Sequence, residues 1–404
     1  PSELSNSEFN SIPEIFKYAS QKFSNIIAFN NLGSNLSYKK TALLSNKFSA
    51  YLYNVLKIKK GDKVAVMLPN LLTFPISFFG SLNIGAIVIN VNPLFKSREV
   101  KSLLTDSNAE TIVILDRFLN QLEPILNDTK IKNIIVCRPY DLLNYPMSLI
   151  VRTLLFFKSK STKISNHYIL FRDTIIHEEK FHQVSISKND VALLQYTGGT
   201  TGKSKAAVLT HHNLVSNIAQ LQLWVDNILL EGKEVIITAL PMYHIFSLTV
   251  NLLFFYKIGS KNILITNPRD LKSFVKTLSR NKFTVITAVN TLFNLLLTST
   301  KFKNTQLQSL KFSVGGGMAV LKSTANKWKE VTGCEITQGY GLTETSPIVS
   351  VNPVGMSFNG SIGLPLPSTE ISIRDENDDE ISVGESGELC IKGPQVMTKY
   401  WNRD

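Results

Sequence analysis

The chain has 404 residues, of which 44% are hydrophobic and 18% charged, and its formal net charge is +12. This length and apolar content allow a large core that is divided into two or three lobes. The positive charge is spread along the chain, so it indicates either a lysine-rich background or attraction to anionic lipids or polyanionic substrates. No motif points to nucleic acid.

The cysteines and the apolar runs bear on the cellular compartment. Cys137, Cys334 and Cys390 are far apart in sequence and form no CxxC pair. This spacing gives no support to a disulfide framework, and it favours a reducing, cytoplasmic location. Because no uncharged apolar run reaches about 18 residues, no transmembrane span is expected.

The first part of the chain alternates between helical patterns and short runs rich in β-branched residues. Helices are expected over residues 12–23, 38–56 and 74–82. The expected strands cover residues 63–69, 86–91, 111–115 and 134–137. Strands of this kind, separated by helical patterns, predict a mostly parallel sheet that is buried on both faces.

One apolar segment, Met147–Phe157, stands apart from this alternation, and Lys158, Lys160 and Lys163 follow it. The segment is too short to span a bilayer. It could lie in a membrane interface with the lysines at the headgroups, which predicts peripheral contact with the inner face of the membrane. The alternative is a helix packed between two lobes.

Residues 196–205 have the sequence YTGGTTGKSK and lie between an expected strand at residues 191–194 and an expected helix after Asn213. Glycines let backbone N–H groups converge on an anion, threonine hydroxyls can bind phosphate oxygens or a cation, and lysines add positive charge. The stretch therefore predicts a loop around nucleotide phosphates, with a flexible surface turn as the alternative. It is not a Walker A loop, because three residues rather than four separate its outer glycines.

The alternation of strands and helices resumes in the second half of the chain. Strands are expected at residues 235–240, 263–265, 284–288 and 312–314, and helices at 248–256, 271–279, 292–298 and 318–331. After about residue 355, runs at 371–374 and 388–391 flank an acidic turn and indicate antiparallel β structure. The predicted fold is α/β, with two lobes of mostly parallel sheet in residues 1–355. A small antiparallel β-barrel-like subdomain is expected in residues 356–404.

Two stretches that follow predicted strands could complement the phosphate loop. His244 comes directly after a strand, and open α/β sheets bind ligands at the carboxyl ends of their strands. The glycines at residues 315–317 also follow a strand and allow a ligand to approach the backbone closely. The structural alternatives are a packed histidine and a tight turn.

Residues 338–346 add an aromatic ring and a carboxylate. Tyr340 is flanked by glycines, so one face of its ring could stack on a flat base. Glu344 could hold Mg²⁺ near phosphate oxygens, since Mg²⁺ takes few protein ligands in nucleotide sites. A last stretch, residues 387–394 followed by Tyr400 and Trp401, indicates only β structure by itself.

In this order and spacing, the motifs resemble those of adenylate-forming enzymes, which include acyl-CoA synthetases, luciferases and peptide-synthetase adenylation domains. The resemblance rests first on YTGGTTG followed by Lys205 and on GYGLTE at residues 339–344. It extends nearly end to end and is closest to bacterial long-chain fatty-acid–CoA ligases. The stretches that carry this extension are MLPN at residues 67–70, VNPL at 91–94, ITNPRD at 265–270, VNTLF at 289–293, SIGLP at 361–365 and KGPQVM at 392–397.

The resemblance implies a reaction in which a fatty acid and ATP form an acyl-adenylate and pyrophosphate, after which coenzyme A displaces AMP. The implied cofactor is Mg²⁺, and the implied partners are fatty acid, ATP and CoA, with a homodimer left open. The catalytic residues would be His244, Lys205 and Glu344, and the metal would lie at Thr200 and Glu344. The acyl tunnel would be bordered by Ile245, Val289, Thr291 and Met318. The ATP-binding residues would be Thr197, Gly198, Gly199, Thr200, Thr201, Gly202, Lys205, Gly315, Gly316, Gly317, Gly339, Tyr340, Gly341, Thr343 and Glu344.

The sequence departs from the family pattern at two places. The phosphate loop continues as Lys203-Ser204-Lys205-Ala206, where the family usually has a small residue or Pro before the lysine and Gly after it. In the family, a small mobile C-terminal domain with a catalytic lysine follows, and this chain stops before it. We therefore expect this chain alone to bind ATP or acyl-adenylate weakly and to turn over slowly. The remaining alternatives are a fatty-acyl-AMP ligase, a ligase that charges acyl carrier protein, or a non-catalytic nucleotide- or acyl-binding protein.

Overall fold

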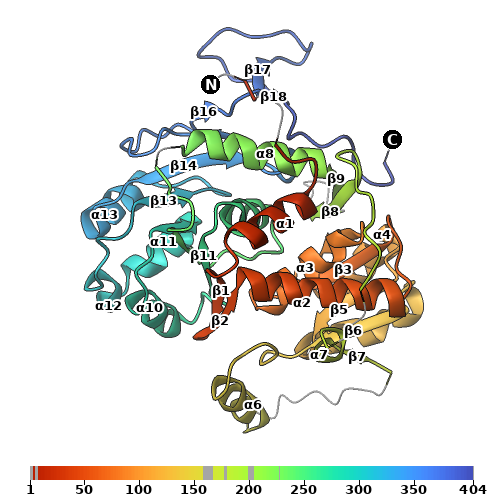
Figure 1. Ribbon diagram of the computed structural model, residues 1–404. Helices are drawn as coiled ribbons and strands as arrows, with labels where there is room; N and C mark the ends of the chain where they lie inside the picture. Colours follow the sequence, from red (N-terminus) through yellow and green to blue (C-terminus); the bar gives the residue numbers. More distant parts are fainter. Residues whose placement is uncertain are drawn as a thin grey trace.

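The computed structural model describes residues 3–4, 8–157, 167–176, 180–198, 204–226 and 228–403. Two large sheets dominate the fold, and helices cover them (Figure 1). The predicted α/β class with mostly parallel sheets is confirmed. Five residues of the predicted phosphate loop, residues 199–203, lie outside the described residues.

The first sheet has seven strands in the order β7-β6-β5-β3-β4-β8-β9. Its pairs are parallel except for β8 and β9, which form an antiparallel hairpin at one edge. The four strands predicted in the first part of the chain are confirmed, whereas β7 and β9 were missed. The strand bounds are β3 (Lys63–Met67), β4 (Ile87–Asn90), β5 (Thr111–Leu115), β6 (Asn133–Cys137), β7 (Ile169–Leu170), β8 (Val191–Thr197) and β9 (Lys205–Thr210).

The second sheet has nine strands in the order β16-β15-β14-β13-β12-β10-β11-β1-β2. Its central strands are parallel, and antiparallel pairs close both edges. The N-terminal strands β1 and β2 join this sheet through parallel pairing of β1 with β11, which the sequence did not predict. The bounds are β1 (Ile27–Asn31), β2 (Ser34–Ser37), β10 (Val235–Thr238), β11 (Lys261–Leu264), β12 (Val285–Ala288), β13 (Phe312–Gly315), β14 (Ile336–Gly341), β15 (Ile348–Val351) and β16 (Leu364–Pro365).

The predicted helices are present, with one corrected boundary. The helix expected at residues 318–331 begins only at Lys322, because Gly317 has φ +73 and breaks the helical path before it. π-helical segments at Tyr51–Val55 and Ser247–Phe254 extend two of the helices. The α-helices are α1 (Ile12–Lys22), α2 (Tyr38–Ala50), α3 (Thr73–Asn83), α4 (Ser97–Ser107), α5 (Leu119–Leu122), α6 (Met147–Phe157), α7 (Phe171–Thr174), α8 (His211–Trp224), α9 (Phe255–Lys257), α10 (Leu271–Ser279), α11 (Asn290–Leu297), α12 (Thr300–Lys303) and α13 (Lys322–Thr332).

An aromatic cluster joins the N-terminal helices to the second sheet. The rings of Phe16 and Phe79 stack with centroids 4.4 Å apart, and Tyr38 lies 4.4 Å from Tyr256. Both tyrosines and Phe79 are nearly fully buried. Because packed aromatic pairs contribute more than their buried area alone, this cluster ties the two lobes into one core.

Helix α6 has no buried residue, so the interpretation of a helix packed between lobes is wrong. It lies at the lower end of the molecule in Figure 1, beyond β7 and α7. Only Met147 and Val151 pack partly against the core. Within the part of the chain that the structure describes, no helix has the length and apolar character that crossing a bilayer requires.

The last part of the chain contains the predicted antiparallel pair, β17 (Glu370–Arg374) and β18 (Glu388–Lys392). In the described residues these two strands form their own two-stranded sheet rather than a barrel. Strand β16 lies beyond residue 355 yet pairs with β15 in the large sheet. The division of the chain into domains at residues 355 and 356 stays a prediction.

Candidate active site

A cavity of about 580 Å³ is lined by residues from strands of both large sheets and from the segments that follow them. Strands β8, β10, β13 and β14 deliver residues to it from their carboxyl ends, the usual ligand position of open α/β sheets. The lining residues are Thr197, Gly198, Lys205, His244, Ile245, Phe246, Val314, Gly315, Gly316, Gly317, Gly339, Tyr340, Gly341, Leu342, Thr343, Glu344, Pro347, Ile348, Val351 and Tyr400. The structure thus brings together the described residues of the phosphate loop, the glycine run, the Tyr340 stretch and His244.

The β8–β9 hairpin supplies the basic side of the cavity. Thr197 pairs with Lys205 in antiparallel register, so both residues reach the cavity wall at the loop end of the hairpin. The predicted ligands Gly199, Thr200, Thr201 and Gly202 fall between them and lie outside the described residues. We conclude that the hairpin places a cation, the Lys205 amine, at the mouth of the predicted phosphate loop.

Strand β14 and the turn that follows it supply the aromatic ring and the carboxylate. Tyr340 is half-buried at the end of β14, and Glu344 lies in a 3-10 turn at Thr343–Thr345. A side chain is not tolerated at Gly341, because its Cβ would come within 2.8 Å of the carbonyl carbon of Pro347. The close approach of the two backbones therefore fixes the path from Tyr340 to Glu344.

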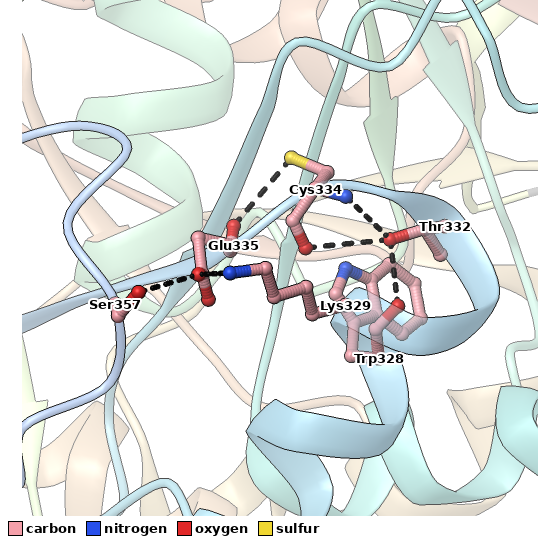
Figure 2. A network of polar contacts seen from close by, with 6 residues as sticks. All are labelled: Trp328, Lys329, Thr332, Cys334, Glu335 and Ser357. Atoms are coloured by element: carbon pink, nitrogen blue, oxygen red, sulfur yellow. Dashed lines mark hydrogen bonds and ion pairs between the residues drawn. The ribbon is translucent and has the colours of Figure 1, made fainter.

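A polar network fixes the turn from α13 into β14, and Figure 2 shows its members. The hydroxyl of Thr332 donates to the carbonyl of Trp328 at 2.8 Å and accepts from the N–H of Cys334 at 3.1 Å. Glu335 pairs with Lys329 and accepts from the hydroxyl of Ser357 at 2.9 Å. These contacts hold the start of the strand that carries Tyr340 into the cavity.

His244 lies on the loop after β10, and its side chain is exposed to the cavity. The surrounding protein limits hydration, and this desolvation lowers the pKa of His244, so the ring is neutral at pH 7. Nδ1 accepts from the N–H of Phe246 at 3.4 Å, so the proton of the neutral ring is on Nε2. The side chain of Asn70 holds this loop by donating to the carbonyls of Thr238 at 3.0 Å and Leu240 at 2.9 Å.

The predicted acyl tunnel is only partly matched by the cavity. Ile245 is buried and lines it, whereas Val289, Thr291 and Met318 do not. Met318 is 59% exposed, because the chain turns outward after Gly317 instead of entering a helix. The apolar end of the cavity is formed by residues that sequence reasoning missed, namely Phe246, Val314, Pro347, Ile348 and Val351.

Besides Leu342, Tyr400 is a further lining residue that the site prediction missed. Its hydroxyl donates to Oε1 of Glu344 at 2.8 Å, and its ring centroid lies 5.4 Å from Nζ of Lys205. Burial, followed by this hydrogen bond, raises the pKa of Tyr400 to about 12, so it is a neutral donor at pH 7. The sequence signal was the pair Tyr400-Trp401, which indicated only β structure.

The donor set fits a metal that is held mainly by a nucleotide. No cluster of three or more His, Cys, Asp or Glu side chains suited to a metal occurs in the described residues. Glu344 is a carboxylate in the wall of the cavity that Lys205 also lines. Mg²⁺ in nucleotide sites is commonly bound by one or two carboxylates together with phosphates and waters, and a lone glutamate suits that role.

The cavity is large enough for a nucleotide and lies at the carboxyl ends of parallel strands in two α/β lobes. It combines a basic hairpin with a turn that carries a tyrosine and a glutamate. These features define an adenylate-forming type of enzyme. A family profile described as AMP-binding enzyme matches residues 16–401, and the chain belongs to this family. It is 43% identical to a long-chain-fatty-acid–CoA ligase of Salmonella typhimurium, with 100% of this chain and 73% of the relative covered. A ligase of the same name from Bacillus subtilis is 31% identical, with 97% of this chain and 70% of the relative covered.

Solved structures share the fold. An anthranilate CoA ligase, AuaEII, in complex with anthranoyl-AMP has a TM-score of 0.86 at 23% identity, with 99% of this chain and 72% of that chain covered. A long-chain-fatty-acid-CoA ligase, FadD1, from Archaeoglobus fulgidus has a TM-score of 0.83 at 22% identity, with 99% and 78% covered. At these identities the likeness bears on the fold alone.

Proposed function

We propose that this protein activates long-chain fatty acids with ATP and transfers them to coenzyme A. The observation that carries the proposal is that one cavity gathers Lys205, His244, Tyr340 and Glu344 from three separate parts of the chain. Identity of 43% to a long-chain-fatty-acid–CoA ligase over the full length of this chain supports the substrate class.

The reaction has two balanced steps. The carboxylate oxygen of the fatty acid attacks the α-phosphorus of ATP, and pyrophosphate leaves with the electron pair of the broken P–O bond. The sulfur of coenzyme A then attacks the acyl carbonyl carbon, the thiol proton is released, and AMP leaves. ATP is needed because a carboxylate is a poor acyl donor, whereas an acyl-adenylate carries a good leaving group.

Charge on the phosphates is the main electrostatic problem of the first step. Lys205 stabilises the charge that builds up on the departing pyrophosphate, since a fixed cation needs no reorganisation during the reaction. Glu344, together with Thr200 as the sequence predicts, would hold Mg²⁺, which when bound would spread phosphate charge and orient the leaving group. Tyr340 stacks on the adenine ring.

Neutral His244 orients the fatty-acid carboxylate. Since Nδ1 accepts from the backbone, Nε2–H is the donor that can hydrogen-bond to a carboxylate oxygen. The apolar wall formed by Ile245, Phe246 and Val351 suits the first carbons of an acyl chain. The continuation of the tunnel past Val289, Thr291 and Met318 stays a prediction.

The test uses the whole gene product with short-, medium- and long-chain fatty acids, ATP and Mg²⁺. We expect pyrophosphate release with long-chain acids and thioester formation with coenzyme A. Lys205→Ala should weaken ATP binding at least about tenfold, because it removes a direct charge contact to phosphate. Lys392→Ala is the control, since Lys392 pairs with Glu370 at 3.2 Å on an exposed sheet outside the cavity.

The acceptor decides between the enzyme alternatives. A fatty-acyl-AMP ligase would release pyrophosphate without forming a CoA thioester, and a carrier-protein ligase would transfer the acyl group to carrier protein only. Binding of ATP without pyrophosphate release would favour the non-catalytic alternative. Absence of ATP binding would refute the proposal as a whole.

We also propose that α6 contacts an anionic membrane surface. Its apolar side chains stand clear of the protein: Leu154 is 55% exposed, Phe156 71% and Phe157 77%. In sequence, Lys158, Lys160 and Lys163 follow directly and match anionic headgroups, although they lie outside the described residues. A cytoplasmic location with contact at the inner face of the membrane, and a homodimer, stay predictions.

A further inference from the structure

The segment around Tyr400 pairs with the edge of the first sheet through an isolated antiparallel bridge. Strand β9 lies at the edge of that sheet. The N–H of Val208 donates to the carbonyl of Lys399 at 3.0 Å, and the N–H of Trp401 donates to the carbonyl of Ala206 at 2.8 Å. Tyr400 forms an antiparallel bridge with Ala207 between these bonds. Residues 399–401 are therefore fixed against the strand that begins with Lys205.

Side chains on both flanks anchor this segment. The indole N–H of Trp401 donates to the carbonyl of Asp106 at 3.1 Å, next to the end of α4. On the other flank, the amide of Asn213 in α8 donates to the carbonyls of Pro394 at 2.9 Å and Val396 at 2.8 Å. With both flanks held, the Tyr400 ring has little freedom to leave the cavity wall.

The backbone of the same segment also holds the turn that carries the carboxylate. The N–H of Met397 donates to the carbonyl of Glu344 at 2.7 Å. Together with the hydroxyl contact of Tyr400 at 2.8 Å, this gives Glu344 a main-chain and a side-chain contact to the segment. Across the cavity, Nζ of Lys205 lies 5.4 Å from the centroid of the Tyr400 ring, within the range of a cation–π contact. Tyr400 therefore touches both charged groups that the proposed function assigns to the phosphates and their metal.

The two carboxylate oxygens of Glu344 have different environments. Oε1 accepts the hydrogen bond from Tyr400, while Oε2 accepts none from the described residues. A metal-binding carboxylate whose second oxygen is held by a donor is already oriented when the ligand arrives. Without that donor, the side chain must be ordered during binding, and this ordering costs affinity.

We infer that Tyr400 is a positioning residue for the metal–nucleotide complex: its hydroxyl holds Oε1 of Glu344 and leaves Oε2 for the metal, while its ring holds Lys205 beside the phosphates. This inference rests on the proposed function, because it assumes that Glu344 and Lys205 serve ATP. The tyrosine acts only through these two side chains and takes no part in bond making or breaking.

The test is Tyr400→Phe, which removes the hydroxyl and keeps the ring, the strand pairing and the contact with Lys205. Affinities for Mg–ATP, and for AMP in the presence of a chelator, are measured by calorimetry, and Mn²⁺ binding in the ATP complex by electron paramagnetic resonance. Loss of a hydrogen bond to a charged group should weaken Mg–ATP binding about tenfold, with a matching loss of Mn²⁺ affinity. Metal-free AMP binding should stay within about twofold, because it does not depend on Glu344.

Two further variants sharpen the comparison. Tyr168→Phe is the matched control, since Tyr168 donates to Glu123 at 2.9 Å on an exposed surface remote from the cavity, and it should bind both ligands as the parent does. Glu344→Gln should make the effect of Tyr400→Phe on Mg–ATP largely disappear, because the two residues act through one contact.

The outcomes are distinguishable. If the parent protein does not bind Mg–ATP, the proposed function fails and this inference fails with it. If the parent binds but Tyr400→Phe binds Mg–ATP equally well, only the inference is overturned. If Tyr400→Phe weakens AMP as much as Mg–ATP and lowers the unfolding temperature, Tyr400 has a merely structural role and the inference is likewise overturned.

Discussion

Gly341→Ala tests whether the close backbone approach beside Glu344 supports the site. A Cβ at residue 341 would lie 2.8 Å from the carbonyl carbon of Pro347, closer still to its oxygen, and 3.1 Å from Cα of Ile348. Ordinary contact would require the two backbones to separate by about 1 Å. This shift breaks the hydrogen bond from the N–H of Leu342 to the carbonyl of Pro347, which measures 3.0 Å. One lost backbone bond plus overpacking amounts to about 3 kcal/mol of unfolding free energy.

The matched control is Gly339→Ala, two residues earlier on the same strand. There the added Cβ would meet the carbonyl oxygen of Ser350 at 3.3 Å and Val351 at 3.5 Å, which needs only a small adjustment. We expect a cost of about 1 kcal/mol or less in urea unfolding. Calorimetry with Mg–ATP should show at least about tenfold weaker binding for Gly341→Ala, because Glu344 moves with the displaced turn. Equal unfolding free energies for the two variants would refute the reasoning.

Three other predictions concern a buried carboxyl, a helix side chain and the apolar helix. Burial raises the pKa of Asp141 from 3.8 to about 6, so the folded state is favoured by protonation and loses this stability as the pH rises through 6. Asp141→Asn should therefore raise the free energy of unfolding, measured with urea, by about 2 kcal/mol at pH 7.5 and leave it unchanged at pH 4. An increase that does not depend on pH would contradict this reasoning. Asn213→Leu removes two buried hydrogen bonds and the cap contact to Thr210, and it should lower the free energy of unfolding by about 3 kcal/mol. The control Asn83→Ala should lower it by about 0.5 kcal/mol or less, because the amide of Asn83 meets only exposed Asn46. Replacing Leu154 and Phe157 together by Glu should lower the amount of protein that sediments with anionic vesicles at least about tenfold. Val383→Glu, at an exposed apolar site elsewhere, should not lower it. Unchanged sedimentation of the double variant would contradict the membrane proposal.

The central strands were predictable because each is a continuous apolar run buried on both faces. Strand β5, with the sequence TIVIL, is buried at every position. Strand β14 was missed because its sequence ITQGYG contains two glycines, which are depleted in strands and read as a loop. It is a strand because β13 pairs with it on one side and β15 on the other. Pairing partners far away in sequence decided this element.

Contacts between segments that are far apart in sequence also separate the site residues that the sequence could predict from those that it could not. The phosphate loop, Tyr340 and Glu344 lie in short motifs whose chemistry is local, whereas the hairpin that carries the loop was missed together with β9. The apolar wall and Tyr400 depend on how segments more than fifty residues apart meet, as in the contact of Tyr400 with Glu344, which are 56 residues apart. Val289 and Met318 follow strands, as His244 does, but position after a strand does not say whether a side chain enters the cavity.

Helix α8 accounts for how such irregular segments are held in place. Three amide side chains, Asn213, Asn217 and Gln220, recur at helical spacing on one face of a largely buried helix. Asn217 both donates to the carbonyl of Ile348 at 2.9 Å and accepts from its N–H at 3.1 Å. Gln220 donates to the carbonyl of Pro367 at 2.7 Å and to Gln395 at 3.0 Å.

Segments without regular structure cannot satisfy all their backbone groups internally, and a buried polar group without a partner destabilises the fold. The amide face of α8 supplies those partners to the turn after Glu344 and to the segment before Tyr400 at once. A row of amides at helical spacing is readable from sequence. Its physical meaning is that the helix braces loops, and here the braced loops carry the carboxylate and the tyrosine of the candidate nucleotide site.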